Sequence, residues 1–254
     1  MPLLVPAGLV LGALIVGLFA WGRAAAPAAK PAGKGKPPEK GPASGPSAAG
    51  LLLDAAKAGR LLPIRWVPVE LPGGLTIEVT ADALMAPAGG EGAVRLPVSY
   101  KDQVAIAKLL GAVSPTRAWW DATFKAAPIK IPPAPLPAGP QMGSLAYALK
   151  YSRSVDEAIQ KRGGTPGESF ARDVGKGWVL DPSISQKGAV NYGWIQPSNG
   201  VPIQSLGHGH NAAHHDYSQT AVLVKRMARR GGEAVDLLDE LAASVPAEYL
   251  APYR

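Results

Sequence analysis

Short apolar runs separated by turn residues indicate strands in several parts of the chain. Residues 64–71 and 75–81 are two such runs, joined by Pro72-Gly73-Gly74, and together they predict a β-hairpin. We expect the segment 217–227 to be a strand that ends at the turn 229–232, with a helix over the same residues as the alternative. Further strands are predicted at 94–98, 178–180, 190–194 and 201–206.

Apolar residues at spacings of three and four predict helices elsewhere. Gly163–Gly167 should end one of these helices, and the six prolines of 128–140 predict an extended connection over the surface. Because helices and strands alternate without an internal repeat, we expect a single mixed α+β globular domain. The predicted helices are 51–62, 101–110, a segment that starts at Ser114 and includes Phe124, 143–162 and 233–243.

The first residues differ from the rest, because residues 2–21 carry no charge. An apolar segment of this length matches the roughly 20 residues that a helix needs to cross a bilayer. Trp21 stands where an interfacial aromatic residue belongs. We therefore expect a retained transmembrane anchor at 1–22, with the lipid bilayer as a partner. A cleaved signal peptide, processed near Ala24 and Ala26, is the alternative, although it would lack the usual basic start.

Residues 23–49 consist mostly of Ala, Pro, Gly, Lys and Ser, which predicts a disordered linker. The globular domain should follow, with an N-terminal part at 50–140 and a C-terminal part at 141–254. The linker holds +4 of the net charge of +7, so the folded part lacks the basic surface typical of nucleic-acid binding proteins. We expect no nucleic-acid partner and a basic tether beside an anionic membrane surface.

The charge pattern leaves the side of the membrane open. Positive charge follows the predicted span and none precedes it, which by the positive-inside rule places the domain in the cytoplasm. A role in a bacterial envelope needs the opposite orientation, and a viral membrane would allow either. The chain contains no cysteine, which excludes disulfides, thiolate nucleophiles and cysteine-bound zinc in any compartment.

All four histidines of the chain fall within residues 208–215, next to Asp216 and Ser218. Histidine titrates near neutral pH and is the commonest metal ligand, so this segment holds most of the candidate chemistry. On a helix, His210 and His214 would share a face, whereas Asp216 would point elsewhere. In an extended segment the shared face would hold His208, His210, His214, Asp216 and Ser218.

Three interpretations of this cluster stay open. His210, His214 and Asp216 would bind a divalent metal ion such as zinc and leave an open position for water. Without a metal, His210 or His214 would act as general base for Ser218 and be oriented by Asp216. No nucleophile elbow surrounds Ser218, which weakens this second interpretation. In the third interpretation the cluster is a buried polar network that ties a loop to a sheet.

Lys176 is the most informative single charge outside the cluster. It stands between Gly175 and Gly177, and glycines let a backbone approach a ligand closely, so Lys176 would meet an anionic group there. A plain turn is the simpler alternative. Trp119-Trp120 is interpreted as core plus surface, and Tyr192–Trp194 as the core of a sheet.

Several segments resemble a family of largely uncharacterised bacterial, phage and fungal proteins. The similarity covers about residues 51–226 and is most specific in the last third. Among the earlier segments, Arg65–Val69 is similar. The specific segments are Asp173-Val-Gly-Lys-Gly-Trp-Val-Leu180, Asn191-Tyr-Gly-Trp194, Pro202-Ile-Gln-Ser-Leu206 and the run from His210 to Gln219 with its Asp-Tyr-Ser ending.

The resemblance implies an architecture more than a reaction. His208 and His215 do not match the motif of the family, and Ile195 stands where the family often has a histidine after Tyr-Gly-Trp. If that histidine is a ligand or base in relatives, this chain lacks it. Secreted members of the family favour an envelope substrate. The residues that match motif positions are Lys176, Tyr192–Trp194, His210, Asp216, Tyr217 and Ser218.

We therefore expect a membrane-anchored, envelope-associated protein. The leading hypothesis is a peptidoglycan hydrolase in which His210, His214 and Asp216 are metal ligands or acid–base groups and Ser218 and Lys176 are auxiliary. The alternative is a non-enzymatic structural or docking component that binds virion or envelope proteins. A cytoplasm-facing adaptor would follow from the positive-inside rule.

Overall fold

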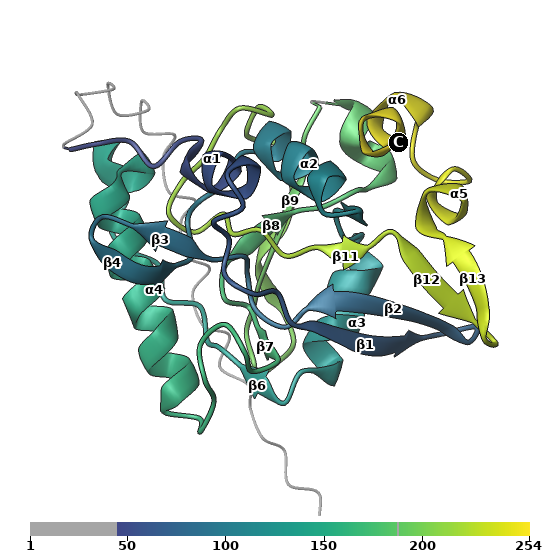
Figure 1. Cartoon of the computed structure of the whole chain (residues 1–254), viewed down its shortest axis with the longest axis horizontal. Helices are drawn as coiled ribbons and strands as arrows, with labels where there is room; N and C mark the ends of the chain where they lie inside the picture. Colours follow the sequence, from purple (N-terminus) through teal and green to yellow (C-terminus); the bar gives the residue numbers. More distant parts are fainter. Residues whose placement is uncertain (1–44, 187) are drawn as a thin grey trace, which may run out of the picture. The chain divides into compact units, whose positions relative to one another are not determined.

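The computed structural model describes residues 45–254, apart from residue 187. The predicted anchor at 1–22 and most of the predicted linker at 23–49 therefore lie outside the described residues. Within the described part, none of the helices combines the length and the apolar character that a bilayer crossing requires. Helices and strands occur together along this part of the chain, which confirms the α+β class (Figure 1).

The largest sheet joins strands from both ends of the described chain. β1 and β2 form the antiparallel hairpin that the sequence predicts, and Gly73 and Gly74 in its turn have φ angles of 79° and 71° that favour glycine. β2 also pairs with β11 and β12, so the predicted parts 50–140 and 141–254 share one sheet. The six strands are β1 (Trp66–Leu71), β2 (Leu75–Thr80), β5 (Ala112–Val113), β11 (Val224–Lys225), β12 (Met227–Arg230) and β13 (Glu233–Asp236).

A second, three-stranded antiparallel sheet positions most of the candidate site. It consists of β8 (Lys176–Trp178), β9 (Asn191–Ile195) and β10 (Pro202–Gly207), with β9 in the middle. An isolated parallel bridge between Lys176 and Gln219 brings the segment after the histidines against β8. Two smaller pairs are β3 (Ala86–Ala88) with β4 (Glu91–Val94), and β6 (Ile129–Lys130) with β7 (Ala171–Arg172).

The longer helices begin at side-chain caps. Ser99, Thr116 and Ser144 each accept a hydrogen bond from the backbone N–H three residues later, which satisfies an otherwise free donor of the first turn. Figure 1 shows α3 behind the β1–β2 hairpin and α4 beside β3 and β4. The helices are α1 (Leu51–Lys57), α2 (Tyr100–Leu109), α3 (Arg117–Ala126), α4 (Leu145–Gln160), α5 (Leu237–Leu241) and α6 (Ala247–Leu250), with 3₁₀ turns at Pro140–Gly143, Pro182–Gln186 and Ala251–Tyr253.

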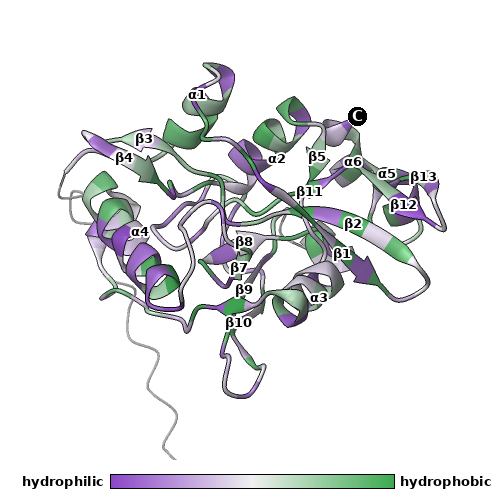
Figure 2. Ribbon diagram, turned by 60° about the horizontal axis from the view of Figure 1, so that its bottom comes forward, coloured by the Kyte–Doolittle hydropathy of each residue, from purple (hydrophilic) through white to green (hydrophobic). Residues whose placement is uncertain are grey.

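The helical prediction is confirmed for α2, α3 and α4, and α1 is shorter than predicted. Gly59, with a φ of 64°, ends α1 before residue 62. Figure 2 shows hydrophobic and hydrophilic residues alternating along α4, as expected for a helix with one buried stripe. That stripe consists of Ala148, Tyr151, Ser152, Val155 and Ile159.

Three predicted elements are wrong over most of their length. The predicted strand 217–227 is irregular up to Leu223, because the turn that follows Asp216 is bonded by its own side chains. Of the predicted helix 233–243, Leu237–Leu241 is helical, whereas Glu233–Asp236 is strand β13, since Gly231 and Gly232 form the turn of a hairpin with β12. The predicted strand 94–98 ends at Val94. Beyond it Arg95 is fully buried and pairs with the carboxylates of Asp82 and Asp156.

Trp120 of α3 connects this helix to the second sheet. A Cβ atom on Gly177 would lie 2.6 Å from Cη2 of the indole, and one on Gly193 would lie 2.9 Å from Cζ2. The two glycines therefore leave room for the buried ring. The side chains of Trp119 and Tyr192–Trp194 are buried too, so the sheet-core interpretation of 192–194 is confirmed, whereas the expectation that part of Trp119-Trp120 is surface is wrong.

Candidate functional site

The histidine segment is neither an extended strand nor a helix. After β10 the chain turns, and the carbonyl oxygen of Asn211 accepts a hydrogen bond from His214 N at 3.1 Å, while its side chain accepts one from Ala213 N at 2.9 Å. This turn places the imidazole of His214 on that of His210. The two rings are parallel within 4° and their centroids are 3.8 Å apart.

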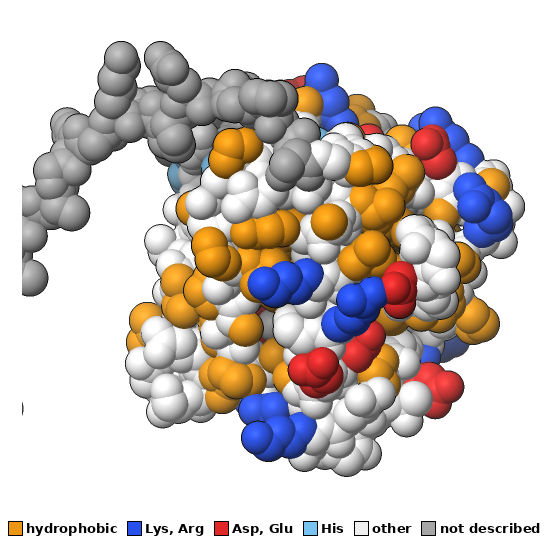
Figure 3. All heavy atoms as spheres, turned by 90° about the vertical axis from the view of Figure 1, so that its left-hand side faces the viewer, with side chains coloured by type: hydrophobic (Ala, Val, Ile, Leu, Met, Phe, Trp, Pro, Cys, Tyr) orange, Lys and Arg blue, Asp and Glu red, His pale blue; other side chains and the backbone are white. Residues whose placement is uncertain are grey.

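The four histidines do not form one cluster. His208 Nε2 lies 2.8 Å from Ser183 Oγ, in the 3₁₀ turn after β8, and so contacts a different part of the fold. His215 packs against the backbone of Gly143, where a Cβ atom would come within 3.2 Å of His215 Nε2. Only His210 and His214 stack, and Figure 3 shows histidine side chains at the upper edge of the face that it views.

Asp216 is the centre of the site. Its side chain is almost completely buried, and its Oδ2 atom accepts a hydrogen bond from Lys176 Nζ at 3.3 Å. The same oxygen lies 3.5 Å from His214 Nε2, a buried nitrogen that makes no hydrogen bond among the described residues. The other oxygen, Oδ1, accepts hydrogen bonds from the backbone N–H and the hydroxyl of Ser218. Asp216 therefore joins a lysine, a histidine and a serine.

These contacts keep the carboxylate of Asp216 ionised. Burial by itself raises the pKa of Asp216, because it removes water from the charged form. The contacts with His214, Lys176 and Ser218 favour the charged form and outweigh burial, so the pKa lies well below its usual range. Burial also lowers the pKa of His210, and the charges of His214 and Lys176 lower it further. At neutral pH His210 is therefore uncharged.

Lys176 is a buried strand residue, so the plain-turn interpretation is wrong. The anionic group that its ammonium meets is the carboxylate of Asp216. A Cβ atom on Gly175 would lie 2.5 Å from Thr220 Oγ1 and 2.7 Å from the carbonyl oxygen of Ser218. The flanking glycines thus allow close packing inside the protein. The ammonium group of Lys176 lies 5.3 Å from the centre of the Trp194 ring, on which it makes a cation–π contact.

Two residues beside the site, Asp173 and Trp194, have a strained backbone that the sequence does not predict. Asp173 and Trp194 have φ angles of 59° and 54°, which residues other than glycine adopt rarely. The carboxyl group of Asp173 holds this geometry, because it accepts hydrogen bonds from Trp120 Nε1 at 3.1 Å and from the backbone N–H of Ile195. No sequence signal marks such a contact, since the partners lie far apart along the chain.

The geometry disfavours two of the three interpretations of the cluster, the serine nucleophile and the metal site. Ser218 is buried and its hydroxyl donates to Asp216, so it is not placed as an exposed nucleophile. A metal ion on Asp216 would meet the charge of Lys176 on the same oxygen. Among the residues that the structure describes, no group of three or more His, Asp or Glu side chains is arranged so that it could bind a metal ion. His214, with one third of its side chain exposed, remains reachable from solvent.

Searches against protein-family models, curated proteins and solved structures found no match to this chain.

Proposed function

We propose that this chain is a hydrolase of a cell-envelope polymer, with peptidoglycan as the substrate and His214 as the acid–base group. The observation that carries the proposal is the series of contacts from Lys176 through Asp216 to His214, at 3.3 and 3.5 Å. An ionised carboxylate behind an imidazole fixes the ring orientation and stabilises the imidazolium that forms when the ring takes a proton.

The role of His214 follows from its two ring nitrogens. Nε2 faces Asp216, so in the neutral ring this nitrogen carries the proton and Nδ1 is the acceptor. Nδ1 would take a proton from a water molecule as that water attacks the carbonyl carbon of an amide bond. The imidazolium would then return the proton to the leaving amine. His210 stacks on His214 and, being neutral, holds the ring without adding a second charge.

The substrate class is supported by where the linker would enter the domain. Ala48 N donates to the carbonyl oxygen of Gly143 at 3.0 Å, and Tyr217 N donates to that of Met142 at 2.8 Å. Residues 142 and 143 thus contact both Ala48, at the end of the predicted linker, and Tyr217, next to Asp216. With the anchor and linker that the sequence predicts, the site would stay within reach of a polymer close to the membrane.

The test is hydrolysis of isolated sacculi by the full chain, followed by chromatography of the released fragments. We expect release by the wild type and a decrease of roughly 10²- to 10⁴-fold in His214→Gln, the usual contribution of a general base. His208→Gln is the matched control, because His208 contacts Ser183 and not Asp216. No release by the wild type alongside an active reference enzyme, or equal release by His214→Gln, would contradict the proposal.

A docking role is the second candidate, and one surface observation favours it. β10 is an edge strand of its sheet, and its residue Ile203 has 53 % of its surface exposed, next to Val201 with 52 %. Edge strands with exposed apolar side chains are common sites of strand addition by a partner. If Ile203→Lys abolishes binding to an envelope or virion protein while sacculi stay intact with the wild type, this second function replaces the first.

A further inference from the structure

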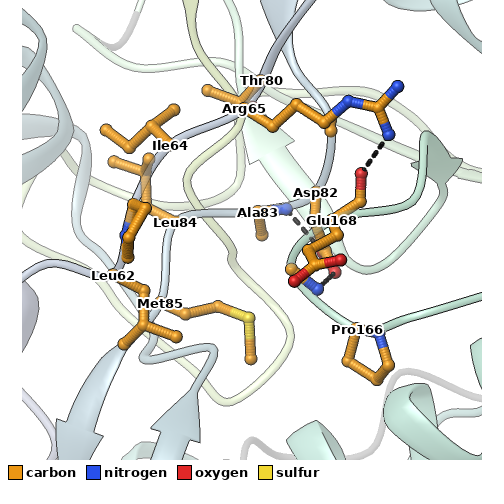
Figure 4. A pocket seen from close by; sticks show the side chains of 13 residues that line it. Leu62, Ile64, Arg65, Thr80, Asp82, Ala83, Leu84, Met85, Pro166 and Glu168 are labelled. Atoms are coloured by element: carbon orange, nitrogen blue, oxygen red, sulfur yellow. Dashed lines mark hydrogen bonds between the residues drawn. The ribbon is translucent and has the colours of Figure 1, made fainter.

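A small cavity lies between three segments that share no residue with the histidine site. Its volume is about 140 Å³, and it is bordered by residues 62–65, 80–85 and 166–168 (Figure 4). An engineered protein cavity of roughly 150 Å³ holds a benzene molecule, so a cavity of this size takes about six non-hydrogen atoms. That is room for an aliphatic amino-acid side chain, whose charged groups would lie outside the cavity at its exposed edge. It is too small for a drug-sized molecule, whose pockets measure roughly 300–1,000 Å³.

Hydrogen bonds hold the three segments in place. Leu62 N donates to the carbonyl oxygen of Met85 at 2.9 Å, and Ala81 N donates to that of Arg65 at 2.8 Å. The third segment is fixed by Gly167 N, which donates to Asp82 Oδ2 at 2.9 Å. The cavity is therefore formed by the fold itself, and a ligand would not need to order its walls.

The two sides of the cavity differ in character. Figure 4 shows the apolar side chains of Leu62, Ile64, Leu84 and Met85 on one side and Arg65, Asp82 and Glu168 on the other. Asp82 is not available to a ligand as a charge, because the buried guanidinium of Arg95 pairs with it. The exposed side chains of Arg65 and Glu168 thus provide one positive and one negative group at the polar side.

The charges of Arg65 and Glu168 are not paired with other charged side chains of the described residues. Arg65 Nη1 donates to the backbone carbonyl oxygen of Glu168 at 2.6 Å, which leaves the other donors of its guanidinium. Among residues 45–186 and 188–254, neither Arg65 nor Glu168 has an ion-pair partner. A cation and an anion that are both exposed on the polar side of an apolar cavity are complementary to a small zwitterion with an aliphatic side chain.

We propose that this cavity binds a free aliphatic α-amino acid. The carboxylate of the ligand binds the guanidinium of Arg65, and its ammonium group binds the carboxylate of Glu168. Its side chain, of the size of that of leucine, lies against Leu62, Ile64 and Met85. The proposal does not depend on the function of the histidine site, because the cavity and that site are built from different residues.

Isothermal titration calorimetry of the full chain with L-leucine tests this assignment. Two analogues each remove one charge from the ligand: 4-methylpentanoate lacks the ammonium group, and 3-methylbutylamine lacks the carboxylate. We expect saturable binding of one L-leucine per chain and a dissociation constant at least about tenfold higher for each analogue, because each loses a charge-assisted contact. Glycine, which lacks the aliphatic side chain, should bind at least about tenfold more weakly as well.

Variants connect the binding to the cavity. Arg65→Gln and Glu168→Gln should each weaken L-leucine binding about tenfold or more, whereas the exposed charge changes Arg60→Gln and Glu70→Gln, outside the cavity, should leave it unchanged. Absence of saturable binding overturns the proposal. Equal affinity for 3-methylbutylamine and L-leucine, or wild-type affinity in both cavity variants, also overturns it, because the two charges would then not recognise a zwitterion.

Discussion

Gly177→Ala is the substitution whose effect follows most directly from the geometry. The added methyl group would lie 2.6 Å from Cη2 of Trp120 and closer still to Cζ3, whereas non-bonded carbon atoms prefer roughly 3.5–4.0 Å. The indole cannot move away easily, because its Nε1 donates to Asp173 and its other atoms lie above Gly193. An atom must therefore shift by about 1 Å in a packed core.

Such overpacking costs typically 1–3 kcal/mol, and we expect about 3 kcal/mol here because the neighbouring ring is held by a hydrogen bond. Urea denaturation of the full chain, followed by circular dichroism, measures the change in the free energy of unfolding. Gly209→Ala is the matched control, since a Cβ atom at Gly209 meets no atom within 4 Å. We expect that variant to differ from the wild type by less than about 0.5 kcal/mol.

A double-mutant cycle with Trp120→Phe identifies the clash as the cause. Phenylalanine lacks the outer ring to which Cζ3 and Cη2 belong, so the methyl group of Gly177→Ala no longer meets them. The double variant should thus be less destabilised than the sum of the single variants, by about 0.5–3 kcal/mol. Additive effects, or a Gly177→Ala variant within 0.5 kcal/mol of the wild type, would refute this account of the packing.

Three further predictions concern the charges of the site. Asp216→Asn removes the partner of a buried ammonium group and should cost about 3–5 kcal/mol in urea denaturation, whereas Glu78→Gln, which breaks an exposed ion pair, should cost less than about 1 kcal/mol. Burial raises the pKa of Asp173 from 3.8 to about 8, so its contribution to stability is present below pH 4 and is lost as the pH rises through 8. The stability of the wild type relative to Asp173→Asn should therefore fall between pH 4 and 8, and a constant difference would contradict it. If the cluster binds zinc, elemental analysis should find stoichiometric zinc in the wild type and no zinc in the His210→Ala, His214→Ala double variant. Equal metal content in the two proteins would contradict the metal hypothesis.

The local parts of the fold were predictable from the sequence. The hairpin around Gly73 and the helices capped by Ser99, Thr116 and Ser144 are specified by residues within a few positions of each other. The C-terminal β12–β13 hairpin was not predictable from the sequence. A Gly-Gly pair such as Gly231-Gly232 occurs both in turns between two strands and in turns that precede a helix. Pairing with β2 decides between them, and that strand is distant in the sequence.

The sequence predicted which residues belong to the candidate site better than it predicted how they are arranged. The spacing of His210 and His214 correctly suggested that they share a face, although a turn and not a helix brings them together. The contact of Lys176 with Asp216 depends on a bridge between β8 and a loop, which no local pattern specifies. Burial is what separates Ser218 from an exposed nucleophile, and burial is a property of the assembled fold.

The order of strands in the large sheet also determines when this protein can fold during its synthesis. Thr76 of β2 lies opposite Arg229, and Val79 lies opposite Val224, so this central strand takes its partners from residues far downstream in the sequence. The β1–β2 hairpin can form early, but its remaining edge stays open until residues 224–230 have left the ribosome. Until then, that exposed edge is available to other nascent chains and to chaperones.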